Sequence, residues 1–305
     1  MLNHTPPRTQ YNFSMASPQS LFSARHLVEE RHRASVLGAA FGQDFAIEYA
    51  LDHALNAWTA ESKASSNIWA SFADFIQASY DDLTEPDRRP RLLPPNSVPF
   101  FAWNTFVFEA YTFMAPRSAT WWYILDMTTP RPANIIPSSL FIPYANAAPV
   151  RSENALQGFK RTPLWFICQD GGLGVPVEGR RPMLWHGSKD FRRFDGSWRM
   201  TVKLKFSWPG YDGNWEKQIR LESENGDRSI DRLAGLVANK VRDFIYAHDP
   251  DVNHSFGTHA RWRIGRRPGQ ISAPDVLLLG IFLVSDGSAM PILQVREDFG
   301  EAGLL

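Results

Sequence analysis

The chain has almost no cysteine and no excess of charge, and each lack argues against a class of protein. Cys168 is the only cysteine in 305 residues, which excludes a disulfide framework within the chain and favours a reducing, intracellular compartment, cytoplasmic or nuclear. The 32 Lys and Arg side chains are balanced by 32 Asp and Glu side chains. Because proteins that hold nucleic acid or anionic membranes usually carry a strong basic excess, a membrane partner is not expected and nucleic acid is disfavoured.

Long apolar runs and enzyme signatures are also missing. The longest strongly apolar run, residues 276–284, reaches about half the length that a membrane helix needs. Residues 1–8 are polar and interrupted by proline, so no signal peptide is expected there. The sequence contains neither Gly-x-Ser-x-Gly nor Ser-x-x-Lys. We therefore predict no catalytic residue and no cofactor.

The composition is that of a globular protein whose first third is helical. Hydrophobic residues make up 44% of the chain and charged residues 21%. From Ser20 to about Tyr80, alanine is frequent, Gly and Pro are rare, and apolar residues recur three or four positions apart. This spacing predicts three helices, near residues 20–40, 43–61 and 65–80.

Glu29 and His32 have the i, i+3 spacing that di-metal sites use in helix bundles. Such a site needs a second Glu-x-x-His pair and two further carboxylates, and the sequence has no second pair. We therefore interpret Glu29 and His32 as part of a solvated helix face that also carries Glu30, Arg31 and Arg33.

Closely spaced prolines mark a boundary after the helical region, because they remove backbone donors and block the α conformation before them. We predict a disordered tail over residues 1–19, a helical region over 20–83, a Pro-rich connector over 84–99 and an α+β domain over 100–305. The fold class is α+β, with an N-terminal helical layer followed by a largely antiparallel β-sheet and one packed helix.

Aromatic residues crowd the start of the predicted α+β domain, between Phe100 and Phe113. Their density favours buried strands, since large aromatic side chains usually belong to the core. The alternative is an exposed stacking platform for bases, sugars or another flat ligand.

Side chains alternate cleanly from Ser197 to Trp208, which predicts an antiparallel strand with one buried face. The side chains expected on that face are Trp198, Met200, Val202, Leu204, Phe206 and Trp208. Pro209 and Gly210 suit the two central positions of a type II turn that reverses the chain into a second strand. Trp208, Tyr211 and Trp215 are expected to clamp this turn onto the sheet, and a binding site near them is the alternative.

The remaining segments predict one helix and three strands. Apolar residues at helical spacing predict a helix over residues 230–245, ended by Asp249 and Pro250. An alternating strand is expected around Trp262, and the run 276–284 predicts a central strand covered on both faces. Asp286-Gly287 predicts a hairpin into a last strand, which Pro291 either begins or places at an edge.

Two sequence signatures lie in the C-terminal half of the chain. One is the Trp208-Pro209-Gly210-Tyr211 turn with Trp215 after it, and the other is the run 275–281 closed by residues 284–288. Together they resemble an expanded set of proteins from mushroom-forming fungi to which no activity is assigned. The resemblance implies a fungal source and a shared domain, and it implies no reaction.

Two segments contain residue types that often bind phosphate or metal, and we interpret both segments as structural. Residues 170–174 are glycine-rich, but Pro176 follows too closely for a phosphate-binding helix start, so a hairpin is expected. His254 and His259 lie in a polar loop with other His and Asp residues and are the candidate metal ligands. Without paired cysteines or a His-Glu-x-x-His run, an exposed polar loop is favoured.

One basic, aromatic-interleaved stretch is the candidate nucleic-acid site. It contains Arg261, Arg263, Arg266 and Arg267 around Trp262. In a chain without net charge, we expect only weak binding there.

The absence of catalytic signatures favours a non-enzymatic intracellular binding or interaction module with a protein partner. The alternative is an enzyme or small-ligand binder whose pocket lies near the Trp208–Trp215 turn. A weak nucleic-acid binder that uses Arg261–Arg267 is the second alternative.

Overall fold

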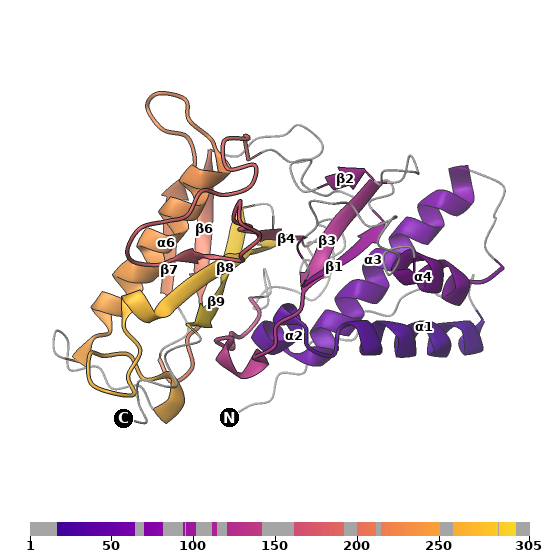
Figure 1. Cartoon of the computed structure of the whole chain (residues 1–305), viewed down its shortest axis with the longest axis horizontal. Helices are drawn as coiled ribbons and strands as arrows, with labels where there is room; N and C mark the ends of the chain where they lie inside the picture. The colour runs from indigo at the N-terminus through magenta and orange to yellow at the C-terminus, as the bar shows by residue number, and fades with distance from the viewer. Residues whose placement is uncertain are drawn as a thin grey trace, which may run out of the picture.

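The computed structural model describes residues 17–64, 70–81, 94, 96–101, 112–114, 121–141, 162–191, 200–211, 215–250, 259–285 and 287–296. The fold is α+β, as predicted, with mainly N-terminal helices, a small antiparallel sheet and a larger mixed sheet (Figure 1). None of the helices in these ranges has the length and apolar character that a membrane span requires.

The helical region contains four helices, α1 (Pro18–Arg31), α2 (Val36–Phe41), α3 (Gln43–Ala64) and α4 (Phe72–Asp81). The prediction of one helix over residues 20–40 was therefore wrong. The chain leaves α1 at His32, and Ser35 caps α2 by accepting a hydrogen bond from the Gly38 amide at 2.7 Å. Gly42, with a φ of 105° that favours glycine, separates α2 from α3.

The helices lie beside a small sheet of β1 (Ser97–Phe101), β3 (Trp121–Met127) and β2 (Thr112–Met114), in that order and all antiparallel. Phe100 of β1 is fully buried and meets Phe75 of α4 edge to face. Burial of the aromatic segment is thus confirmed at Phe100, while residues 102–111 lie outside the described ranges. β1 begins within the stretch predicted as connector.

The larger sheet contains β4 (Thr162–Trp165), β5 (Val175–Pro176), β6 (Thr201–Phe206), β7 (Trp215–Arg220), β8 (Val276–Ser285) and β9 (Ser288–Val295). Its order is β4-β8-β9-β6-β7, and β5 also pairs with β8. Only β6 and β9 pair in parallel. β8 is central and almost entirely buried, as its unbroken apolar run predicted.

The prediction for Pro291 was wrong. Pro291 lies in the middle of β9, opposite Ile281, and β9 is an inner strand between β8 and β6. β6 pairs with β9 only at Ser288 and Ala289. The ladder with β6 has ended before Pro291, so its missing N–H costs no hydrogen bond to that strand.

The predicted register of β6 is confirmed over most of its length. Val202, Leu204 and Phe206 are buried and Lys203 is exposed. Met200 was wrongly predicted on the buried face, since it precedes β6 and is 50% exposed. Trp198 lies outside the described residues.

Helix α6 (Ile230–Ala247) packs on this sheet against β5, β7 and β8. Ser229 caps the helix by accepting a hydrogen bond from the Arg232 amide. The predicted apolar stripe is buried throughout, and it comprises Ile230, Leu233, Ala234, Val237, Val241, Phe244 and Ile245.

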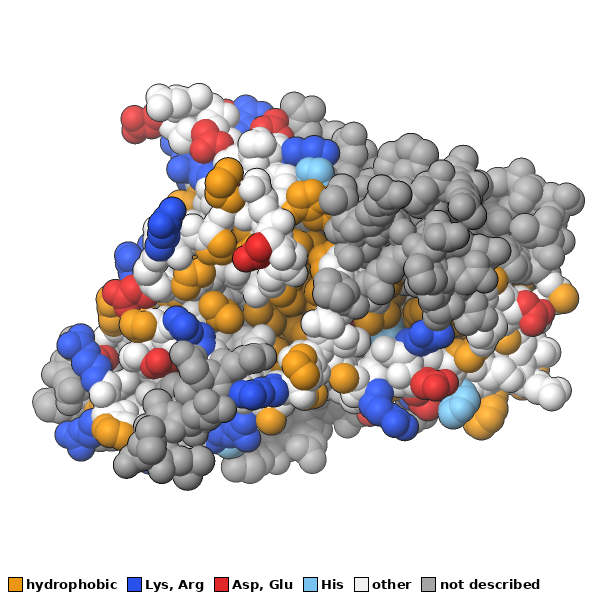
Figure 2. Space-filling view, viewed as in Figure 1, with side chains coloured by type: hydrophobic (Ala, Val, Ile, Leu, Met, Phe, Trp, Pro, Cys, Tyr) orange, Lys and Arg blue, Asp and Glu red, His pale blue; other side chains and the backbone are white. Residues whose placement is uncertain are grey.

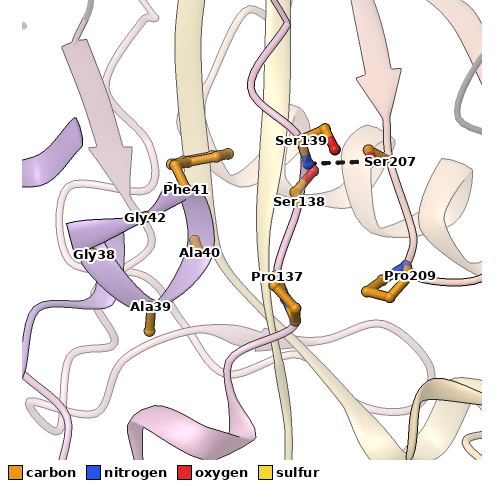
Figure 3. A pocket seen from close by; sticks show the side chains of 10 residues that line it. All are labelled: Gly38, Ala39, Ala40, Phe41, Gly42, Pro137, Ser138, Ser139, Ser207 and Pro209. Atoms are coloured by element: carbon orange, nitrogen blue, oxygen red, sulfur yellow. Dashed lines mark hydrogen bonds between the residues drawn. The ribbon is translucent and has the colours of Figure 1, made fainter. Parts of the chain in front are cut away.

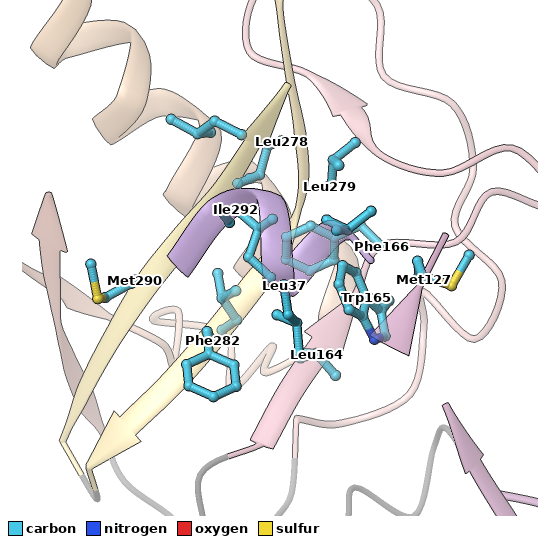
Figure 4. Packing of buried hydrophobic residues seen from close by; sticks show 14 of the residues in the cluster. Leu37, Met127, Leu164, Trp165, Phe166, Leu278, Leu279, Phe282, Met290 and Ile292 are labelled. Atoms are coloured by element: carbon cyan, nitrogen blue, oxygen red, sulfur yellow. The ribbon is translucent and has the colours of Figure 1, made fainter. Parts of the chain in front are cut away.

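One hydrophobic core extends through both sheets. Figure 4 shows Leu37 of α2 among side chains of β4, β8 and β9. The short helix α2 therefore lies where the N-terminal helices meet the larger sheet, and it also contacts β3.

Candidate functional site

The Trp208–Tyr211 turn has the predicted geometry. The Tyr211 amide donates a hydrogen bond to the Trp208 carbonyl at 3.1 Å, and Gly210 has a φ of 86°. Both features define a type II turn, in which only glycine adopts the second central position without strain. The turn reverses β6 into β7, as expected.

The three aromatic residues of this turn, which were the candidate ligand-binding residues, are packed into the protein. Trp208 is 2% exposed and donates from Nε1 to the Trp262 carbonyl at 2.7 Å. The Tyr211 hydroxyl accepts from the Ile264 amide at 2.7 Å. Trp215 lies against Phe206, with ring centroids 4.6 Å apart. The polar atoms of Trp208 and Tyr211 thus anchor residues 262–264, which follow α6, and this gives the aromatic residues of the turn a structural role.

A surface hollow of about 420 Å³ lies beside the turn instead (Figure 3). It is lined by residues 38–42 of α2 and its end, by Pro137, Ser138 and Ser139, and by Ser207 and Pro209. The Ser139 amide donates to Ser207 Oγ at 3.2 Å, and the Ser138 amide donates to the Ala40 carbonyl at 2.7 Å. These two hydrogen bonds join the three segments that form the hollow.

Among the described residues that line the hollow, none has a titratable side chain. The sequence suggested a pocket near the turn only as an alternative and did not identify most of this lining, because its residues come from three distant segments and match no motif. Pro209 within the predicted turn and Ser207 just before it were the local signal for the site.

A buried polar cluster lies at the start of α2, and it overturns the interpretation of His32. His32 does not lie on a solvated face, because its side chain is fully buried. His32 Nδ1 lies 3.1 Å from Asp126 Oδ2 of β3, and Nε2 lies 3.3 Å from the Tyr80 hydroxyl of α4. The residues of α1, α4 and β3 that meet here are far apart in the sequence, so no local pattern predicted the contact.

Asp126 is the centre of this cluster. Its Oδ2 also accepts a hydrogen bond from Ser35 Oγ, and its Oδ1 accepts from the amides of Leu37 at 3.2 Å and Met127 at 2.7 Å. Desolvation raises the pKa of the Tyr80 hydroxyl, and the negative charge of Asp126 adds to this effect. Ser35 bonds the carboxylate and not His32, so this is not a nucleophile activated by an imidazole.

The candidate nucleic-acid residues do not lie on the predicted strand. Ala260–Trp262 form the short helix η3, in which Trp262 is buried. Arg261 donates to the Ala133 carbonyl, and Arg266 Nε donates to the buried Asp249 at 2.9 Å. Arg263 is partly buried, and Arg267 is exposed. Acidic and basic side chains are interspersed on the face seen in Figure 2, which is unlike an extended basic surface.

We expect duplex and single-stranded nucleic acid to bind only weakly at physiological salt, because few guanidinium groups are available for phosphate contacts. The double variant Arg261→Ser, Arg267→Ser should remove most of this binding while keeping the Arg266–Asp249 pair. Fluorescence anisotropy at two salt concentrations measures both the affinity and its shallow salt dependence. A nanomolar complex at physiological salt that the double variant loses would contradict this expectation.

The candidate metal ligands are not brought together in the described part of the chain. His259 is exposed, and His254 lies outside the described residues. The neighbouring His248 and Asp249 are engaged, His248 Nδ1 with the Phe244 carbonyl at 2.8 Å and Asp249 with Arg266. No group of three or more His, Cys, Asp or Glu side chains suited to a metal occurs among the residues that the structure describes.

The glycine-rich stretch forms the predicted hairpin. Ile167 and Leu173 pair as an antiparallel bridge, and the Gly174 amide donates to the Phe166 carbonyl at 2.7 Å. Cys168, within this hairpin, is buried, and its thiol lies 3.3 Å from the Gly174 carbonyl. Burial, with a smaller contribution from Asp170, raises the pKa of Cys168 to about 11.

Cys168 is therefore expected to resist a thiol reagent in the native protein. Its raised pKa keeps the thiol protonated at neutral pH. A free cysteine has a pKa of about 8.5 and reacts as the thiolate. Even at pH 9, labelling of the native protein should be far slower than labelling in denaturant. Release of a chromogenic thiolate measures both rates, and equal rates would show that Cys168 is accessible.

The chain matches no protein-family model, and no match to it was found among curated proteins or solved structures.

Proposed function

We propose that the protein is a non-enzymatic, intracellular protein-interaction module whose partner docks in the hollow between α2 and the end of β6. The observation that supports this is the chemistry of the described lining, which offers backbone groups, serine hydroxyls and apolar side chains, none of them titratable. A serine nucleophile needs a base within hydrogen-bond reach, and the described lining residues provide none. This chemistry is suited to binding.

The same lining indicates what kind of partner segment fits. A charged side chain buried there would lose its hydration without gaining an ion pair, which is costly. A short, uncharged segment in an extended conformation would instead place its amides near Ser138, Ser139 and Ser207. The volume of about 420 Å³ is at the lower end of the usual range for ligand sites, which favours a few residues of a partner.

The exposed large apolar side chains do not offer a competing surface. Phe22, Met183, Met200 and Tyr246 are the exposed members among the described residues, and they belong to four separate segments. Such scattered side chains are ordinary on a protein surface.

We further propose that the similar proteins of mushroom-forming fungi share this scaffold. The signature residues support the framework, since Trp208 and Gly210 form the turn, and a Cβ at Gly280 would collide with the Leu164 carbonyl of the neighbouring strand. These positions are therefore constrained by the packing of the framework. The residues that line the hollow are not constrained in this way and can differ between members.

Site-specific cross-linking tests the interaction. A photoreactive amino acid at the exposed Ser139 should capture a defined protein from an extract of the native organism, whereas the same group at Gln218 on β7 should not. The captured partner is then purified and titrated against the protein and its variants.

The decisive variant is Ala39→Arg, which fills the hollow, with Ala70→Arg as its matched control before α4. Ala39→Arg should weaken the purified partner's affinity at least about tenfold, a loss of about 1.4 kcal/mol. Equal affinities of the two variants, or equal capture at both cross-linking positions, would reject the hollow as the docking site.

A further inference from the structure

A glycine in helix α6 creates a place for an arginine side chain. The guanidinium of Arg181 lies on α6 at Gly235, where an added Cβ would stand only 2.7 Å from Arg181 Nη1. Glycine weakens a helix interior. Its presence in the second turn of α6 is explained by the space that Arg181 occupies.

Two further residues of α6 lie on the same face as Gly235. Arg181 Nη2 donates to Asn239 Oδ1 at 2.8 Å, four positions along the helix, and Arg242 follows three positions later. The Asn239 side chain thus accepts from Arg181 through Oδ1 and has an NH2 group that can donate. Arg181, Arg242 and the Asn239 NH2 group therefore place hydrogen-bond donors on one patch of surface.

The two guanidinium groups are close enough to repel each other. Partial burial, followed by the positive charge of Arg242, lowers the pKa of Arg181. No carboxylate pairs with Arg181 in the described part of the chain, and Arg242 has only the adjacent Asp243, at 3.9 Å. Asp243 itself pairs with Lys240 at 3.1 Å. Within the described residues, Arg181 thus has no carboxylate partner, and Arg242 has only a distant one that Lys240 shares.

We propose that Arg181 and Arg242, with the NH2 group of Asn239, form a binding site for an oxyanion, of which a phosphate monoester is the best match. A dianionic phosphate balances two guanidinium charges, and the planar guanidinium donates paired hydrogen bonds to its oxygens. A phosphorylated side chain and a free phosphate ester both carry this group. None of the three residues lines the hollow beside α2, so the site is independent of the proposed function.

Gly235→Ala tests the site without removing a charge. The added methyl group displaces only the end of a flexible side chain, and alanine is the better helix former, so the melting temperature should stay equal or rise. Because Arg181 is displaced, the variant should nevertheless bind phosphate more weakly. A variant that is at least as stable but binds less tightly separates binding from folding.

Binding is measured by calorimetric titration of the full chain with inorganic phosphate, with chloride adjusted to hold ionic strength constant. We expect saturable one-site binding to the wild type, weakened on the order of tenfold by Gly235→Ala and by Arg242→Gln. The matched control Lys217→Gln removes a positive charge from the exposed face of β7 and should bind within about twofold of the wild type. A phosphoserine peptide and its unphosphorylated form then distinguish a phosphorylated partner from a free phosphate ester.

Non-saturable binding, or an equal loss in Lys217→Gln and Arg242→Gln, would reduce the effect to general electrostatics and overturn the proposal. So would a Gly235→Ala protein that binds phosphate as tightly as the wild type. None of these results bears on cross-linking at the hollow, so the two proposals fail or stand separately.

Discussion

Val202→Asp is expected to unfold the larger sheet. Val202 lies on the buried face of β6, is 3% exposed and is paired with the equally buried Ile219 of β7. A carboxylate there would be desolvated without a partner, at a cost of about 4 kcal/mol or more. This is a large part of the stability of an ordinary domain. Thermal and urea unfolding, followed by circular dichroism, should show a protein that is largely unfolded or melts at much lower temperature.

Lys203→Asp is the matched control at the next residue of the strand. Lys203 is exposed, and its ammonium lies 2.9 Å from Glu216. The substitution breaks a surface ion pair and places two carboxylates near each other, which should cost about 1 kcal/mol. If the two variants are equally destabilised, the alternation of β6 does not mark its buried face.

Elements with a strong period were predictable because their side chains repeat the geometry of the backbone. The two-residue period of Val202, Leu204 and Phe206 sets one face of β6, and the stripe of α6 sets the buried face of that helix. The unbroken apolar run of β8 indicated a strand covered on both faces. In each case the information lies within a single segment.

Features that depend on distant segments were not predictable in the same way. His32 is buried only because Asp126 of β3 and Tyr80 of α4 meet it, and nothing near His32 in the sequence indicates either partner. Pro291 is tolerated inside β9 because the ladder with β6 is short, which is a property of another strand. The alternation around Trp262 resembled a strand, but residues 260–262 form a short helix whose Trp262 carbonyl accepts a hydrogen bond from the distant Trp208.

The candidate site also combines a feature that local sequence predicts with one that depends on distant segments. The Trp208 turn was predicted with its correct geometry, since Pro209 and Gly210 define it locally. A pocket near this turn was one of the alternatives, but its lining was not predicted, because the hollow exists only where α2 and the segment 137–139 approach the end of β6. Sequence motifs identify residues that need special backbone geometry, and a binding surface made of ordinary small residues leaves no such mark.

Asp126→Ala is the second change with a large expected effect. It would leave the buried Ser35 hydroxyl, the His32 imidazole and the amides of Leu37 and Met127 without their shared acceptor. Losing one partner from a buried polar cluster costs about 3–5 kcal/mol. Because Asp126 joins β3 to the start of α2, we expect the N-terminal helices to lose protection in hydrogen exchange, and urea unfolding to give the total cost.

Asp126→Asn separates the hydrogen bonds of this cluster from its charge. The oxygen of the introduced carboxamide can still accept from the two backbone amides, and its NH2 group replaces the oxygen that faces Ser35 and His32. A neutral His32 can adapt by exchanging tautomers, so that Nδ1 accepts from this NH2 group and Nε2–H donates to Tyr80. The cost should then be about half that of Asp126→Ala. A protonated His32 cannot adapt in this way, because both ring nitrogens are donors. If the two variants are equally destabilised, His32 and Asp126 form a buried ion pair, and the charge of Asp126 is as important as its oxygens.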